Sequence, residues 1–121
     1  EGFTPTFRSG IDFGVSQTAP KLAKATRIIE EVRPVARHLF SKVDALVTPT
    51  TPIPAFSFDD EMPKTITTFT AFANYAGCPA LSVPMGMTTD GLPLGLQIVT
   101  PKREEVTSLQ IGAAFETTQN T

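Results

Sequence analysis

One apolar stripe on a long helix constrains this chain more than any other feature. Between residues 17 and 43, apolar side chains recur at alternating steps of three and four, which is the spacing of one helix face. The stripe consists of Leu22, Ala25, Ile29, Val32, Ala36, Leu39 and Val43. A stripe of this length needs a large apolar surface to cover it. Pro34 lies inside the run and predicts a kink or a short break, because proline removes one backbone donor.

Three short apolar runs predict β-strands. Residues 44–49 form a continuous apolar run that a proline ends, which is typical of a strand buried on both faces in a parallel sheet. Residues 80–83 and 94–99 lie on either side of Asp90-Gly91, a strong turn signal. The second and third runs are therefore expected to pair as a hairpin.

Two further helices complete the predicted order. One is expected over 65–76, with Thr65 or Thr67 as its N-cap and Gly77 at its end. The other is expected over 104–116, with a core face of Val106, Leu109, Ala113 and Phe115. Residues 1–16 are expected to form an irregular lead-in, because glycine and proline interrupt every period. Helices on both sides of three strands predict a layered α/β fold, as one flank of a larger sheet.

Charge and composition exclude several classes of function. Ten basic and 12 acidic side chains give a net charge of −2, so no positive surface for nucleic acid is expected. No apolar run approaches the roughly 20 residues of a membrane span, and there is no signal peptide. A cytoplasmic setting and no membrane partner are therefore expected. The single Cys78 excludes an intramolecular disulfide, and with the single His38 it excludes a Cys/His zinc site.

The residues by themselves form no complete catalytic constellation. A Ser-His-Asp hydrolase would need His38, which lies off the apolar stripe of the long helix, and no G-x-S-x-G elbow is present. Cys78 follows a helix end and is expected to be a small buried thiol. The acidic cluster Asp59, Asp60 and Glu61 lies on a proline-rich loop and is expected to face solvent. No catalytic residue and no metal ligand are therefore assigned within this chain.

Two ordered motifs are far more specific than any single residue. Residues 74–86 have the pattern N-x-x-G-x-P-A-x-S-x-P-x-G, and residues 90–97 read D-G-L-P-L-G-L-Q. Upstream, residues 43–52 read V-D-A-L-V-T-P-T-T-P. Together they resemble the C-terminal region of the amidase signature family, over roughly residues 14–116.

The resemblance implies a fold, a reaction and the absence of the catalytic residues from this part of the enzyme. The implied fold is the C-terminal part of a three-layer α/β/α domain with a mixed sheet, so residues 1–121 would be a C-terminal fragment of one amidase domain. Family members hydrolyse a carboxamide C–N bond to an acid plus ammonia or an amine, with a Ser–cis-Ser–Lys triad and no cofactor. The family's Gly/Ser-rich segment and lysine context are missing here, so the chain alone is expected to be inactive. A first residue Glu1 in place of methionine fits a truncation.

The resemblance also implies partners and binding residues. The expected partners are a small-molecule amide and the N-terminal part of the same enzyme, and a homodimer of the full-length protein stays open. The segment that leads into the Asn-containing helix approaches the substrate pocket in family members, so the expected substrate-binding residues are Thr67, Phe69, Thr70 and Asn74.

Two alternatives to a general amidase stay open. The first is a fragment of a glutamine-dependent amidotransferase, similar to the A-type subunit of such enzymes. Such members carry an acidic residue at the place of Thr67 to hold an ammonium group, and a threonine cannot supply that charge. The second is a non-catalytic interaction module left from a split amidase, which would use the apolar helix stripe to bind another chain.

Overall fold

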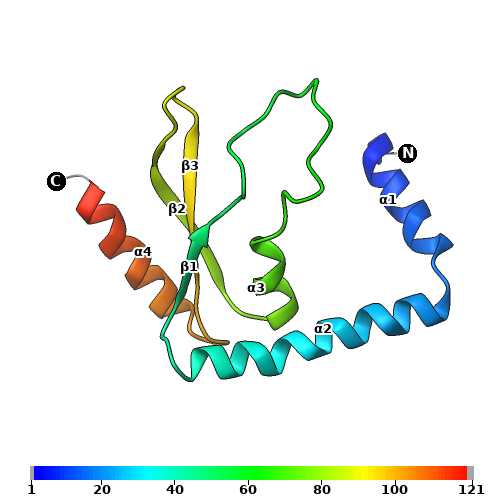
Figure 1. Ribbon diagram of the computed structural model, residues 1–121, viewed down its shortest axis with the longest axis horizontal. Coiled ribbons are helices and arrows are strands. Elements are labelled where there is room, and N and C mark those ends of the chain that lie inside the picture. The colour runs from blue at the N-terminus through cyan, green and yellow to red at the C-terminus, as the bar shows by residue number, and fades with distance from the viewer. Residues whose placement is uncertain (1, 120–121) are drawn as a thin grey trace.

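The computed structural model describes residues 2–119, which form four helices and one three-stranded sheet (Figure 1). The elements in chain order are α1 (Pro5–Ser16), α2 (Ala19–Phe40), β1 (Leu46–Pro49), α3 (Thr70–Ala76), β2 (Ala80–Met87), β3 (Pro93–Val99) and α4 (Glu105–Gln119). The predicted α/β class is confirmed, with one helix more than the three expected.

The sheet has the strand order β1-β3-β2, and both neighbouring pairs are antiparallel. The predicted hairpin of β2 and β3 is confirmed, with Ala80 opposite Val99 and a turn in which the Thr88 N–H donates to the Leu92 carbonyl at 2.8 Å. The expectation that residues 44–49 are buried on both faces is wrong within this chain. β1 pairs only with β3, and its residues alternate between half-buried and exposed.

Helix α4 packs closely on one face of the sheet. A Cβ added at Gly112 would lie 2.5 Å from Leu81 Cδ2 and 3.2 Å from Val83 Cγ1, so the helix backbone rests directly on β2. The predicted core face of α4 is mostly wrong. Ser108 and Gly112 are buried and Phe115 is half-buried, whereas Val106, Leu109 and Ala113 are exposed. Small residues face the sheet because they allow this close approach, and periodicity of large apolar side chains does not show that.

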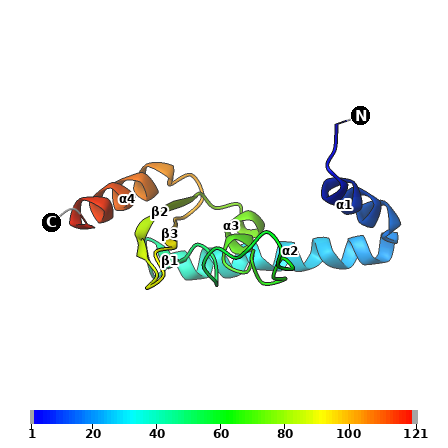
Figure 2. The same cartoon turned by 90° about the horizontal axis from the view of Figure 1, so that it is seen from above.

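Helix α3 lies on the other side of the sheet from α4, and α2 runs across the ends of the strands and packs against α3 (Figures 1 and 2). The predicted long helix is confirmed, and it continues without a break through Pro34. Its apolar stripe is covered only in part, because α3 packs against it around the buried Ala36 while Leu22 is 65% exposed. The order α4, sheet, then α3 and α2 is the three-layer arrangement that was expected.

The predicted irregular lead-in over residues 1–16 is wrong for most of its length. Residues Pro5–Ser16 form a helix, for which the Thr4 hydroxyl accepts from the Phe7 N–H at 3.3 Å and Pro5 occupies the first turn. Proline is tolerated there because its missing N–H has no partner in a first turn. Gly10 and Gly14 weaken the helix without breaking it, at a cost of about 1 kcal/mol each relative to alanine. No residue of α1 is buried.

Candidate functional site: a hydroxyl and amide cavity

The sheet face opposite α4 carries a row of polar side chains. Thr48 of β1 and Ser82 of β2 both lie opposite Gln97 of β3, so the three side chains share one face. Gln97 is 3% exposed, and its Nε2 donates to Thr48 Oγ1 at 3.3 Å and to the Phe69 carbonyl at 3.2 Å. These bonds satisfy the buried amide and connect the segment before α3 to the sheet.

A second polar contact crosses the central strand at Gly95. The Thr50 N–H donates to the Gly95 carbonyl at 2.7 Å, and the hydroxyls of Thr50 and Ser82 lie 2.6 Å apart. A Cβ at position 95 would lie 2.8 Å from Thr50 Oγ1 and 2.9 Å from Ser82 Oγ. Glycine is therefore required for these two hydroxyls to meet above β3.

Helix α3 supplies the opposite wall. It is shorter than the helix predicted over 65–76, because turns over residues 63–68 precede it and the position before its first residue is Phe69, which makes no side-chain cap bond. The predicted N-caps Thr65 and Thr67 are therefore wrong, although the Thr67 carbonyl accepts from Ala71 N at 2.9 Å. The predicted end is confirmed, since Gly77 has a left-handed φ of 67°.

An open cavity of about 340 Å³ lies between the two walls. Its lining consists of Thr50, Thr70, Ala73, Asn74, Cys78, Ala80, Leu81, Ser82 and Gln97. No lining side chain carries a formal charge at neutral pH, since burial raises the pKa of the Cys78 thiol above its usual value and the positive charge of Lys102 only partly opposes this. The cavity therefore offers neutral hydrogen-bond donors and acceptors beside apolar carbon.

The structure brings two of the four predicted binding residues to this cavity. Thr70 and Asn74 line it, and the Asn74 amide nitrogen donates to the Thr70 carbonyl at 3.3 Å. Thr67 and Phe69 do not line it. Thr67 has an exposed side chain and uses its carbonyl to accept from Thr70 Oγ1 at 3.3 Å, while Phe69 contributes only its carbonyl to Gln97.

Seven of the nine lining residues were absent from the predicted set, and three of these, Thr50, Ser82 and Gln97, carry a hydroxyl or amide group. The signal that could have found them is the alternation along the strands, which places Ser82 and Gln97 on one face of the hairpin. Thr50 could not have been placed, because its contact with Ser82 depends on the register of β1 against β3.

Other kinds of site are not found in the part of the chain that the structure describes. Residues 2–119 contain no group of three or more histidine, cysteine, aspartate or glutamate side chains placed to hold a metal ion. The same residues contain no cis peptide bond, and none of their helices is long and apolar enough to cross a membrane.

The sequence profile of the amidase family matches residues 3–109 of this chain. The chain belongs to the amidase family. This confirms the family resemblance carried by the motifs at residues 74–86 and 90–97.

Individual amidase relatives agree with the family assignment. The A-type subunit of the Glutamyl-tRNA(Gln) amidotransferase of Maricaulis maris is 45% identical over 96 residues, which cover 75% of this chain and 19% of that protein. A crystal structure of an amidase superposes with a TM-score of 0.85 at 27% identity, over 96% of this chain and 29% of that one. The corresponding Glutamyl-tRNA(Gln) amidotransferase subunit from Thermotoga maritima superposes with a TM-score of 0.66 at 30% identity. The match covers 87% of this chain and 25% of that one. This amidase chain thus spans about a fifth of the length of the curated relative.

Proposed function

We propose that this chain is the C-terminal part of an amidase catalytic domain and that its hydroxyl and amide cavity forms one wall of the carboxamide site. The observation that carries the proposal is the neutral polar lining of the cavity. A carboxamide has one acceptor oxygen and N–H donors and no charge, so hydroxyl and amide side chains match it without burying an unpaired ion.

The chemistry follows the family mechanism and needs groups outside this chain. A nucleophilic serine attacks the carbonyl carbon, while a lysine takes the serine proton through a bridging serine. Collapse of the tetrahedral intermediate breaks the C–N bond and returns the proton to the leaving nitrogen, and water then hydrolyses the serine ester to the acid. No residue of this chain is assigned to these steps.

Within this chain, Asn74 and Thr70 are the residues proposed to bind and orient the amide. Asn74 uses its amide nitrogen for the Thr70 carbonyl, which leaves its oxygen to accept from a substrate N–H. Such positioning favours attack because it holds the carbonyl carbon near the nucleophile before reaction.

The test is a steady-state measurement on the complete protein with a neutral carboxamide such as benzamide. Asn74→Ala is expected to raise KM up to about tenfold, which is the loss of one hydrogen bond to the substrate. Gln110→Ala is the matched control, because Gln110 is exposed on α4, on the other side of the sheet. Equal KM values for wild type and Asn74→Ala would show that Asn74 does not bind the substrate amide.

A glutamine-dependent amidotransferase is the second candidate, supported by relatives of that name at 37–45% identity. Against it stands the neutral lining of the cavity, together with a threonine at position 67 where the resemblance expects an acidic residue. Ammonia release from glutamine that requires added partner subunits would establish this candidate. A complete protein that turns over neither amide nor glutamine would instead establish the non-catalytic interaction module.

A further inference from the structure

A second and larger cavity lies at the ends of α2 and α3. It measures about 690 Å³ and is bounded by the last turns of α2, the end of α3 and the turn between β3 and α4. Its lining consists of Arg33, Ala36, Arg37, Phe40, Ser41, Ala76, Gly77, Cys78, Pro101 and Lys102. Cys78 is the only lining residue that it shares with the amide cavity, so the two cavities are neighbours with separate walls.

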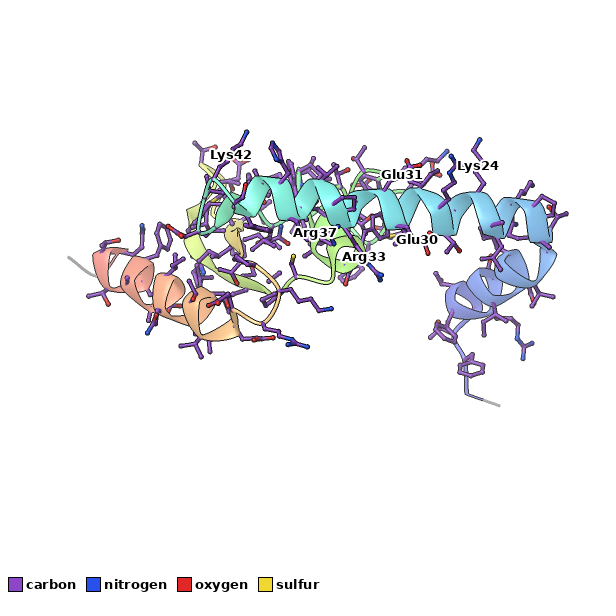
Figure 3. The ribbon with its side chains drawn as sticks, turned by 90° about the horizontal axis from the view of Figure 1, so that it is seen from below. Lys24, Glu30, Glu31, Arg33, Arg37 and Lys42 are labelled. Atoms are coloured by element: carbon purple, nitrogen blue, oxygen red, sulfur yellow. The ribbon has the colours of Figure 1, made fainter. Side chains whose placement is uncertain are left out.

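Three cations border this cavity and no carboxylate lines it. Arg33 and Arg37 are one helical turn apart on α2, and Lys102 comes from the turn after β3. Figure 3 shows Arg33 and Arg37 extending from one edge of α2, with Lys24, Glu31 and Lys42 on the opposite edge. All three bordering cations have exposed side chains, and like charges four residues apart on a helix repel each other, so an anion bound between Arg33 and Arg37 would relieve that repulsion.

Within residues 2–119, none of the three charges has a carboxylate within 4.0 Å. The one ion pair within 4.0 Å in that part of the chain joins Arg27 to Glu31 at 3.5 Å, away from the cavity. Glu30 extends from the same edge of α2 as Arg33, but it does not line the cavity (Figure 3). The Cys78 thiol does not supply a negative charge at neutral pH, because burial raises its pKa.

The floor of the cavity is apolar. Ala36 is 3% exposed and Ala76 is 9% exposed, and Phe40 and Pro101 complete the carbon surface. The cavity volume exceeds that of a bare phosphate, so the site has room for an organic body beside an oxyanion.

We propose that this cavity binds a small organic oxyanion, a carboxylate or a phosphate ester, whose compact apolar body rests on Ala36, Phe40 and Pro101. Guanidinium groups bind such oxyanions through two parallel N–H bonds, and Lys102 adds a point charge from the turn after β3. The site is separate from the proposed amide site, so its failure would leave the proposed hydrolysis untouched.

Calorimetric titration of the complete protein at low salt tests the proposal, with phenyl phosphate, benzoate and inorganic phosphate as probes. Saturable binding of phenyl phosphate or benzoate is expected, and their ratio distinguishes a phosphate ester from a carboxylate. Inorganic phosphate should bind several-fold more weakly, because it lacks the apolar body. Arg33→Gln and Arg37→Gln should each weaken binding about tenfold or more.

Two matched variants and an independent readout sharpen the test. Lys24→Gln removes a cation from the other edge of α2 and should leave the Kd unchanged, whereas Glu30→Gln should leave it unchanged or lower it. The bound probe should also slow alkylation of Cys78, measured by peptide mass spectrometry, because that thiol lines the cavity. The proposal is overturned if no probe binds saturably, or if binding survives the Arg33→Gln/Arg37→Gln double substitution.

Discussion

Gly95→Ala is the substitution that most directly probes how the polar face of the sheet is built. The added methyl would lie 2.8 Å from Thr50 Oγ1 and 2.9 Å from Ser82 Oγ, and these two hydroxyls lie 2.6 Å apart. The methyl must therefore separate them. Loss of that hydrogen bond costs about 1 kcal/mol, and overpacking adds about 1 kcal/mol, because both clashing atoms are side-chain hydroxyls that can rotate away. Alanine also stabilises the protein by about 0.5–1 kcal/mol, because its unfolded chain has less backbone entropy than that of glycine.

The expected net result is a loss of about 1–1.5 kcal/mol in the free energy of unfolding, measured by urea denaturation of the protein that carries this chain. Ser82→Ala in the same background should recover part of the loss, because it removes one of the two clashing oxygens. Gly14→Ala is the control, since a Cβ there meets nothing within 4 Å and alanine should stabilise α1 by up to about 1 kcal/mol. The reasoning is refuted if Gly95→Ala is neutral or stabilising.

Three further outcomes follow from local geometry. Arg103→Gly should stabilise the protein by about 0.5–1 kcal/mol in thermal denaturation, because Arg103 has a left-handed φ of 73°, and a destabilised variant would contradict this. Gln97→Leu should lower the free energy of unfolding by about 2–3 kcal/mol by removing two buried bonds, and a double-mutant cycle with Thr48→Val should show coupling. The alkylation midpoint of Cys78 should lie above the usual thiol pKa, and Lys102→Gln should move it higher still, because Lys102 favours the thiolate; a downward shift would contradict the assigned cause.

The strands and their turn could be predicted because their signals are local. Asp90-Gly91 lies between two apolar runs, and the structure turns at that point with Gly91 at a φ of 79°. Gly77 ends α3 for the same kind of reason, since its left-handed conformation suits glycine. The family motifs over residues 74–97 were equally readable, because they depend on order and spacing alone.

The faces of the helices were harder to predict, because they depend on what packs against them. Gly112 and Ser108 face the sheet, while Val106 and Leu109 are 66% and 58% exposed. Along α2, Leu22 is 65% exposed while Ala36 is buried, although both belong to one stripe. We expect the rest of the amidase domain to cover these exposed side chains, which would reconcile the sequence pattern with the exposure.

The prediction for residues 1–16 is wrong because glycine and proline end a helix only at certain positions. Pro5 lies in the first helical turn, where proline is favoured, and Thr4 caps the helix. Two of the four predicted binding residues line the cavity, and the other two do not, for a related reason. Thr70 and Asn74 lie on the same side of α3, and Thr67 precedes that helix, where turns direct its side chain to solvent.

The most direct test of the central claim is the ratio of kcat/KM for benzamide to that for glutamine, measured as ammonia release by the complete protein with no other subunits added. A neutral cavity wall built by Thr70, Asn74, Ser82 and Gln97 predicts a ratio well above one. Turnover of glutamine in preference to benzamide would contradict the assignment of a neutral amide as substrate. No turnover of either would contradict the claim that this chain forms one wall of a carboxamide site.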